Sequence, residues 1–160
     1  MTIHSSSAKK VVPTISLIQP GQVPAAAELL CAQLTEHDLP SDSREVQSVI
    51  EKIAADERYG FILVAADDTG KLIGVALGCA YLGVEHGGVS GWLEELYVLP
   101  KSRQKGVGTR LVSEVIRLAK SRGWRALDLE VTADHRRVVS LYVRHGFEPR
   151  SRSRFCLKFD

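Results

Sequence analysis

The chain has 160 residues and a formal net charge of +2, with 25% charged and 44% hydrophobic residues. These values are ordinary for a soluble globular protein. No apolar run approaches the roughly 20 residues of a membrane span, and residues 1–10 lack the apolar core of a signal peptide. We therefore expect a cytoplasmic protein with no membrane partner.

The charges are distributed unevenly along the chain. Residues 1–100 contain 6 Lys/Arg and 13 Asp/Glu, whereas residues 101–160 contain 15 and 6. A basic C-terminal part suits a ligand that carries phosphates, and an acidic N-terminal part would attract a cationic one. Only 6% of the residues are aromatic, and no basic run with interleaved aromatics occurs, so we expect no nucleic-acid partner.

The cysteines and histidines predict neither a disulfide nor a metal site. The three cysteines are far apart, odd in number and free of C-x-x-C spacing, which indicates reduced residues of the core. The histidines show no metal-ligand spacing with one another or with a cysteine. The residues considered are Cys31, Cys79, Cys156, His37, His86 and His145.

The first half of the chain predicts a flexible tail, one strand, two helices and a hairpin. Turn signals at Pro20-Gly21 and Pro40, and the sequence Asp-Asp-Thr-Gly at 67–70, separate the elements. The expected segments are a tail over 1–14, a strand over 15–18, helices over 24–37 and 43–57, and hairpin strands over 61–66 and 71–81.

The second half predicts strands that alternate with helices. A glycine-rich loop over 83–91 leads into a strand over 93–99, which Pro100 ends because proline cannot donate to a sheet ladder. Gly123 is expected to end the following helix. The remaining expected segments are a helix over about 107–120, a strand over 126–131, a helix over 135–145, a strand over 155–159, and a short strand near Glu148. Residues 15–160 are expected to form a single domain.

A basic, glycine-bearing loop precedes the helix that starts near Val107. Arg103 and Lys105 place cations where the helix dipole is already positive, and Gly106 and Gly108 would let a phosphate approach the free N–H groups of the first turn. The nucleoside-triphosphate pattern G-x-x-x-x-G-K-[ST] is absent, and the dinucleotide pattern G-x-G-x-x-G fails at Leu111.

The pattern that these loop residues do match is that of the GNAT acetyltransferase superfamily, which the chain resembles over about residues 15–159. The loop 103–108 resembles its coenzyme A pattern [RQ]-x-x-G-x-[GA], and residues 141–148 resemble L-Y-x-x-x-G-F-E. The resemblance implies an α/β (α+β) GNAT fold. Its sheet is mixed and mostly antiparallel, with 6–7 strands flanked by about four helices, in the order β-α-α-β-β-β-α-β-α-β.

The resemblance implies acetyl-CoA as cosubstrate, and the lack of metal-ligand spacing predicts no metal. His135 stands where the family usually has asparagine, near the coenzyme, so side-chain contacts there are in question. The coenzyme-binding residues carried over are Leu96, Tyr97, Val98, Arg103, Gln104, Lys105, Gly106, Val107, Gly108, Thr109 and His135.

Acyl transfer from a thioester to an amine requires a base, donors for an oxyanion, and an acid for the thiolate. Glu94 and Glu95 are the candidate bases; on a regular strand they face opposite sides, and resemblance to the small-amine and polyamine branch favours Glu94. The family takes an oxyanion donor from the main chain at about Leu96–Val98. Tyr142 is the candidate acid.

We therefore predict an acetyl-CoA-dependent N-acetyltransferase that acts on a primary amine of a small cationic molecule, by direct transfer in a ternary complex. Glu36, His37 and Asp38 are candidates for binding the acceptor. The alternatives are acetylation of a protein lysine or N-terminus, and a non-catalytic acyl-CoA sensor. A homodimer is one assembly compatible with this prediction.

Overall fold

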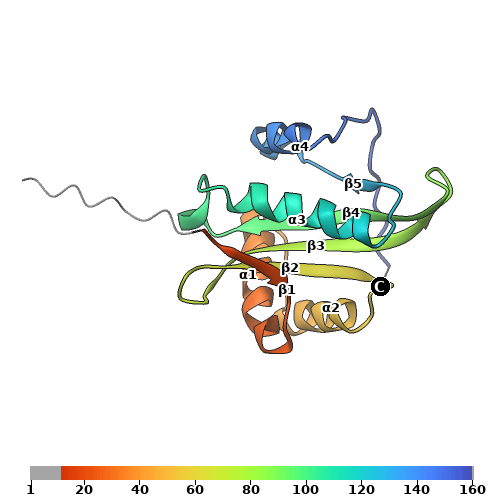
Figure 1. The fold of residues 1–160 in the computed structure, drawn as a ribbon. Coiled ribbons are helices and arrows are strands. Elements are labelled where there is room, and N and C mark those ends of the chain that lie inside the picture. The colour runs from red at the N-terminus through yellow and green to blue at the C-terminus, as the bar shows by residue number, and fades with distance from the viewer. Residues whose placement is uncertain (1–11, 160) are drawn as a thin grey trace, which may run out of the picture. The chain divides into compact units, whose positions relative to one another are not determined.

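A computed structural model of the chain describes residues 12–159 (Figure 1). These residues form two compact units, one ending at Glu130 and the other starting at Val131. Of the predicted tail over residues 1–14, residues 1–11 lie outside the described residues. Its last residue, Thr14, is already the first residue of strand β1.

The first unit is built on a five-stranded sheet with the strands in sequence order. Neighbouring strands are antiparallel, except that β5 runs parallel to β4. The sheet is thus mixed and mostly antiparallel, as predicted, but it has five strands in place of the expected 6–7. The strands are β1 (Thr14–Leu17), β2 (Gly60–Ala66), β3 (Leu72–Gly83), β4 (Gly88–Val98) and β5 (Leu127–Leu129).

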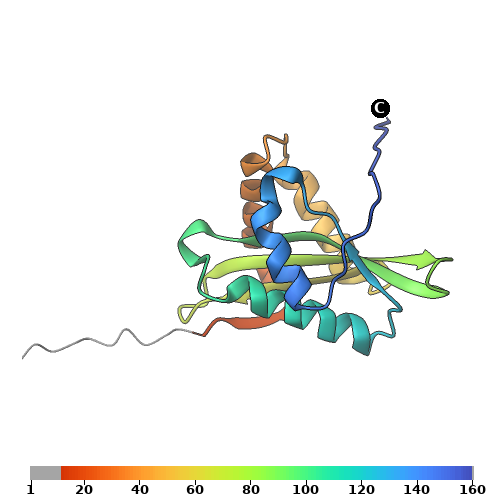
Figure 2. The ribbon, with the colours of Figure 1, turned by 90° about the horizontal axis from the view of Figure 1, so that it is seen from above.

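Helices α1 (Val23–Glu36) and α2 (Ser43–Ala55) cover one face of this sheet (Figures 1 and 2). Their apolar side chains form one core with those of β2, β3 and β4, including the ring of Tyr97. Asp42 caps α2, because its carboxylate accepts hydrogen bonds from the first-turn amides of that helix. The main core is therefore the layer between α1, α2 and the sheet.

Helix α3 (Val107–Ser121) covers the opposite face of the sheet (Figure 2). Leu111, Val112 and Val115 are completely buried. A Cβ at Gly74 of β3 would lie 3.1 Å from the Cδ1 of Leu111, so the glycine allows the helix to pack directly on the strand. Gly123 follows the helix with a φ of +72°, which confirms its predicted role at the helix end.

The predicted glycine-rich loop over 83–91 is instead mostly hairpin. Strand β3 extends to Gly83 and β4 starts at Gly88, which leaves only residues 84–87 as the connection. Gly91 belongs to β4, where a Cβ would lie 1.9 Å from the Trp124 ring. This glycine therefore provides close packing within a strand, and the composition of the segment was misleading.

The second unit contains a 3-10 turn over Ala133–Val138 and helix α4 (Val139–Arg144). The predicted helix over 135–145 is thus α-helical only over Val139–Arg144; the part before it is 3-10, and His135 has non-helical backbone angles (φ −108°, ψ 20°). The strands predicted over 155–159 and near Glu148 are wrong, since residues 145–159 have no helix or strand. A strand needs a partner for its main-chain groups, and residues 131–159 contain no second strand.

Candidate active site

Strands β4 and β5 separate halfway along β4. Their parallel pairing joins Gly91, Trp92 and Leu93 to Leu127–Leu129 and ends there. Strand β4 continues to Val98. Among residues 12–159, no strand pairs with this side of β4 beyond Leu93. We call this unpaired side of residues 94–98 the uncovered edge of β4.

A β-bulge lies where the two strands separate. Across the pairing with β3, Gly78 is opposite Leu93 and Leu77 is opposite Glu95, so Glu94 is an additional residue in β4. Bulges increase strand twist, redirect side chains and occur preferentially beside active sites. The bulge therefore marks the region around Glu94 as a candidate active site.

The bulge also changes the relation between the two candidate bases. Strict alternation does not hold there, because Glu94 and Glu95 together stand opposite a single residue. The Glu95 carboxylate accepts a hydrogen bond of 2.7 Å from Nε2 of Gln33, a buried residue of α1. Burial, together with the charges of Glu94 and Glu95, raises the pKa of the Cys79 thiol to about 11. The bulge thus removes the regular alternation on which the expectation of opposite faces rests, and the role of either carboxylate as base stays a prediction.

The main-chain groups of Leu96 and Val98 point toward the uncovered edge. The amide of Leu99 donates to the carbonyl oxygen of Ile73 in β3, and main-chain groups alternate in direction along a strand. The main-chain N–H and C=O groups of Tyr97 are therefore directed at β3, where Tyr97 pairs with Val75. Of the three predicted main-chain contacts to the coenzyme, those of Leu96 and Val98 lie on the open side.

The N-terminus of α3 has no side-chain cap. Its N-cap residue, Gly106, has a φ of +82°, the first turn contains no acidic residue, and within residues 12–159 no side chain caps it. The first N–H groups, those of Val107, Gly108 and Thr109, precede the first main-chain bond of the helix, from Arg110 to Gly106. A Cβ at Gly106 would meet nothing within 4 Å. Uncapped amides beside open space fit the diphosphate of a coenzyme.

The two loop cations are bound by protein groups. The Arg103 guanidinium donates to both carboxylate oxygens of Glu36, at 2.8 and 2.7 Å, and lies 5.3 Å from the centre of the Tyr97 ring. The Lys105 ammonium donates to the carbonyl oxygen of Lys101 at 2.7 Å. Contact of these cations with a phosphate stays a prediction.

The same contacts fix the end of α1. The hydroxyl of Tyr97 donates to Glu36 at 2.8 Å. Burial acts to raise the pKa of Glu36, but the hydrogen bonds from Arg103 and Tyr97 outweigh it and lower that pKa. Burial and the bond to Glu36 raise the pKa of Tyr97. His37 and Asp38, the other two acceptor candidates, follow the helix and are exposed.

The candidate acid, Tyr142, lies in α4 of the second unit. Its ring contacts Phe147 edge to face, with centroids 5.8 Å apart, and Gly146 between them adopts a φ of +90°. Burial raises the pKa of Tyr142 to about 12. In the same unit, Nδ1 of His135 lies 3.0 Å from the Thr132 hydroxyl. Roles for Tyr142 in catalysis and for His135 in coenzyme binding stay predictions.

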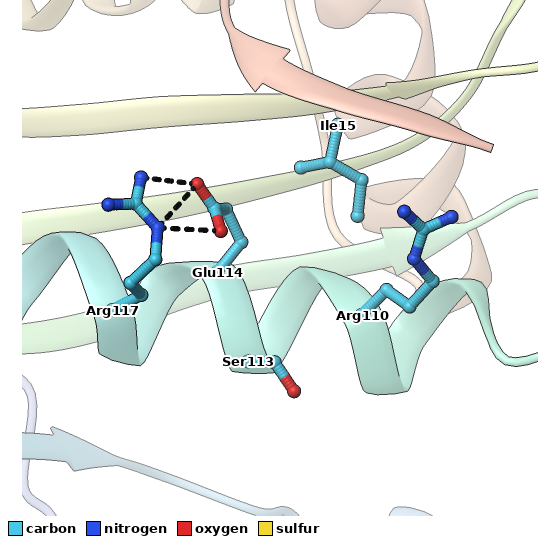
Figure 3. A pocket seen from close by; sticks show the side chains of 5 residues that line it. All are labelled: Ile15, Arg110, Ser113, Glu114 and Arg117. Carbon is cyan, nitrogen blue, oxygen red and sulfur yellow. Dashed lines mark hydrogen bonds and ion pairs between the residues drawn. The ribbon is translucent and has the colours of Figure 1, made fainter.

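A separate hollow of about 330 Å³ lies along α3 beside β1 (Figure 3). Within it Arg117 and Glu114 form a surface ion pair of 2.6 Å. The lining contains none of the predicted catalytic or coenzyme-binding residues, so this hollow is not part of the candidate active site. It is lined by Ile15, Arg110, Ser113, Glu114 and Arg117.

Residues 12–159 contain neither a metal-binding group of side chains nor a membrane-spanning helix. No group of three or more His, Cys, Asp or Glu side chains is arranged to hold a metal ion. No helix in this part of the chain has the length and apolarity that crossing a membrane requires.

Comparison with known proteins gives the family. Residues 23–147 match the sequence profile of the Acetyltransferase (GNAT) family. Because this match covers most of the chain, the protein belongs to the GNAT family of acetyltransferases. The family fold and an enzymatic acyltransferase class, both predicted from the loop and the L-Y-x-x-x-G-F-E segment, are thereby confirmed.

Individual relatives agree with this assignment. The chain is 30% identical over 115 residues to the aminoglycoside N(6′)-acetyltransferase type 1 of Salmonella typhimurium, with 68% of this chain and 74% of the relative covered. It is 38% identical over 56 residues to an uncharacterised N-acetyltransferase of Methanocaldococcus jannaschii, of which it spans only 25%. The fold is similar to that of the aminoglycoside N-acetyltransferase AAC(6′)-Iy in complex with CoA, with a TM-score of 0.79 and 21% identity, covering 94% and 97% of the two chains.

Sequence reasoning missed two features of the candidate site. Gln33 was assigned only to the helix, although a glutamine in the buried stripe with Ala26, Leu29 and Leu30 was a signal that its amide needs a partner. The pairing of Arg103 with Glu36 had no local signal, because 66 residues separate them in the sequence.

Proposed function

We propose that this protein transfers the acetyl group of acetyl-CoA directly to a primary amine of a small cationic molecule. One observation carries the proposal: the uncovered edge of β4. There the carboxylates of Glu94 and Glu95 and the main-chain groups of Leu96 and Val98 occur within five consecutive residues. A base and oxyanion donors are the groups that acyl transfer to an amine requires.

Removal of a proton from the amine is assigned to Glu95. An alkylammonium with a pKa near 10 is almost wholly protonated at neutral pH and must lose a proton before it can attack. The Glu95 carboxylate is partly buried and oriented by Gln33, whereas Glu94 is exposed at the bulge. Glu94 then contributes negative charge that attracts the cationic acceptor. The preference for Glu94 as base, which rests on family resemblance, is the competing assignment.

The remaining groups serve the acetyl donor. Acetyl-CoA supplies a thioester carbonyl, and the amides of Leu96 and Val98 would donate to its oxygen as negative charge develops. The uncapped amides of Val107, Gly108 and Thr109 would hold the diphosphate. Tyr142, protonated at neutral pH with a pKa of about 12, would donate a hydrogen bond to the departing sulfur.

The acceptor class is supported by charge and by similarity. Glu95 faces the junction between α1 and β4, since its carboxylate accepts from Gln33, and Glu94 adds an exposed carboxylate next to it in sequence. A carboxylate-bearing site favours a cationic ligand. The similarity to two acetyltransferases that are named for aminoglycosides agrees with this class.

The proposal is tested by measuring free thiol release from acetyl-CoA with a panel of amines. The panel contains aminoglycosides, polyamines, amino acids and lysine-containing peptides. Saturable turnover with a small cationic amine is the expected result. Turnover with peptides alone would replace the proposal with protein acetylation, and coenzyme binding without turnover would replace it with a sensor role.

A further inference from the structure

Arg103 occupies the first position of the coenzyme loop pattern, yet its guanidinium is bound on several sides by protein. Its Nη2 lies 2.8 and 2.7 Å from the two carboxylate oxygens of Glu36. Its Nε donates to the carbonyl oxygen of Val98 at 2.8 Å, and the group lies over the ring of Tyr97. Nε and Nη2 of the guanidinium thus both donate to protein groups, beside a carboxylate of opposite charge.

These contacts connect three elements that border the candidate active site. Glu36 is the last residue of α1, Val98 is the last residue of β4, and Arg103 lies in the loop before α3. Tyr97 bonds to the same carboxylate through its hydroxyl. The loop also contains Gln104 with a φ of +61°, a backbone conformation that non-glycine residues rarely adopt without support from their surroundings.

We propose that Glu36, Tyr97 and Arg103 form a positioning clamp that sets the coenzyme loop against α1 and β4. In this arrangement Arg103 increases the affinity for acetyl-CoA through the geometry of the loop and not by contacting a phosphate. The inference rests on the proposed use of acetyl-CoA. It makes Glu36, a residue of the opposite helix, a determinant of coenzyme affinity.

The physical reason lies in the hydrogen bonds of the guanidinium. One guanidinium nitrogen, Nη2, donates to both oxygens of the Glu36 carboxylate, so a phosphate would have to compete with this carboxylate for the cation. The side chains of Arg103 and Glu36 are 35% and 38% exposed, so solvent screens the pair and its effect is moderate. Orientation of the loop amides, which is sensitive to small displacements, is the property such a clamp controls.

Glu36→Gln separates the clamp from direct phosphate binding, because the two models predict opposite signs. The clamp predicts that the Kd for acetyl-CoA, measured by calorimetry, rises about 5-fold and that the KM for acetyl-CoA rises with it while kcat changes less than about 2-fold. If Arg103 binds a phosphate directly, the substitution frees a cation, so affinity would stay constant or increase. That result would overturn the clamp.

The matched control is Glu114→Gln. The Glu114 carboxylate also accepts hydrogen bonds from an arginine, that of Arg117 at 2.6–3.0 Å, but on the outer surface of α3. We expect no change in coenzyme affinity for this variant. An equal loss in both variants would attribute the effect to net charge and would contradict the clamp.

Arg103→Lys provides a second test that does not depend on Glu36→Gln folding well. Lysine keeps the charge but has one nitrogen, which cannot replace both the Nη2 bonds to Glu36 and the Nε bond to Val98, so the clamp predicts the same loss as Glu36→Gln and no further loss in the double variant. Wild-type affinity in Arg103→Lys, or additive losses, would overturn the clamp. If the wild-type protein binds no acetyl-CoA, the proposed function fails. The clamp is then tested by thermal unfolding, where additive Tm shifts of the two single variants would refute it.

Discussion

The side-chain amide of Gln33 donates a hydrogen bond of 2.7 Å to the carboxylate of Glu95, while its own carbonyl oxygen is buried and has no hydrogen-bond partner among the described residues. Leaving a buried acceptor unsatisfied costs about 1–3 kcal/mol. The protein therefore places a costly group on the buried face of α1 to hold one carboxylate of β4. This is the arrangement expected where the orientation of that carboxylate matters for function.

Gln33→Leu should test this relationship. Leucine removes both the donor to Glu95 and the unsatisfied carbonyl, so the free energy of unfolding should change by less than about 1 kcal/mol. Loss of orientation should lower kcat about 10-fold. The acidic limb of the pH–rate profile should move to higher pH, because a donor favours the charged carboxylate. Thermal unfolding and kcat measured from pH 5 to 9 give both quantities.

Gln47→Leu is the control for that change, since the Gln47 amide donates only to the Ser43 hydroxyl within α2. Its pH–rate profile should match the wild type. A Gln33→Leu enzyme with wild-type kcat and an unchanged profile would show that Gln33 does not act on catalysis.

Glu95→Gln and Glu94→Gln should affect different kinetic constants. If Glu95 is the base, its substitution lowers kcat about 100-fold and abolishes the acidic limb of the profile. Glu94→Gln should mainly raise the KM for a cationic amine, by removing a charge that attracts it. Steady-state kinetics at several pH values distinguish the two. The reverse pattern would assign the base to Glu94, as family resemblance favours.

The sequence predicted those parts of the fold that local patterns determine. Helices α1, α2 and α3 have apolar stripes and end signals, and the Asp-Asp-Thr-Gly turn marks the β2–β3 hairpin. Elements that depend on distant partners were less predictable. Residues 155–159 alternate like a strand but have no pairing strand in their unit, and Gly91 signals a loop although it packs under Trp124.

The candidate site divides in the same way. The coenzyme loop could be located because its glycines and its place before a helix are contiguous in sequence. The bulge at Glu94 could not, because it depends on the register of β4 against β3 and β5. That register decides that Glu94 and Glu95 do not alternate. Likewise, only the packing of α1 against β4 brings Gln33 to Glu95 and Glu36 to Tyr97.

Gly106→Val should abolish acetyl-CoA binding while the fold persists. The new side chain would occupy the open space beside the first amides of α3, and the φ of +82° would destabilise the protein by roughly 1–2 kcal/mol. Gly70→Val is the matched control, because Gly70 has a φ of +85° and also no neighbour within 4 Å of a Cβ, but lies in the β2–β3 turn. Calorimetry should show binding only in the control. Unchanged affinity in Gly106→Val would refute the diphosphate site.

Tyr142→Phe should lower kcat about 100-fold and leave the Kd for acetyl-CoA within about 2-fold of wild type, since only the donor to sulfur is lost.

The pKa of about 12 for Tyr142 also has a consequence for stability. A group whose folded pKa is raised contributes stability that is complete below its unfolded pKa, near 10, and is lost as pH rises through 12. The wild type should therefore lose stability between pH 10 and 12, and Tyr142→Phe should lose less. Tyr59→Phe, at an exposed tyrosine, should behave as the wild type in chemical denaturation across this range and in kcat. Equal kcat in Tyr142→Phe and wild type would remove Tyr142 from the mechanism, whatever its effect on stability.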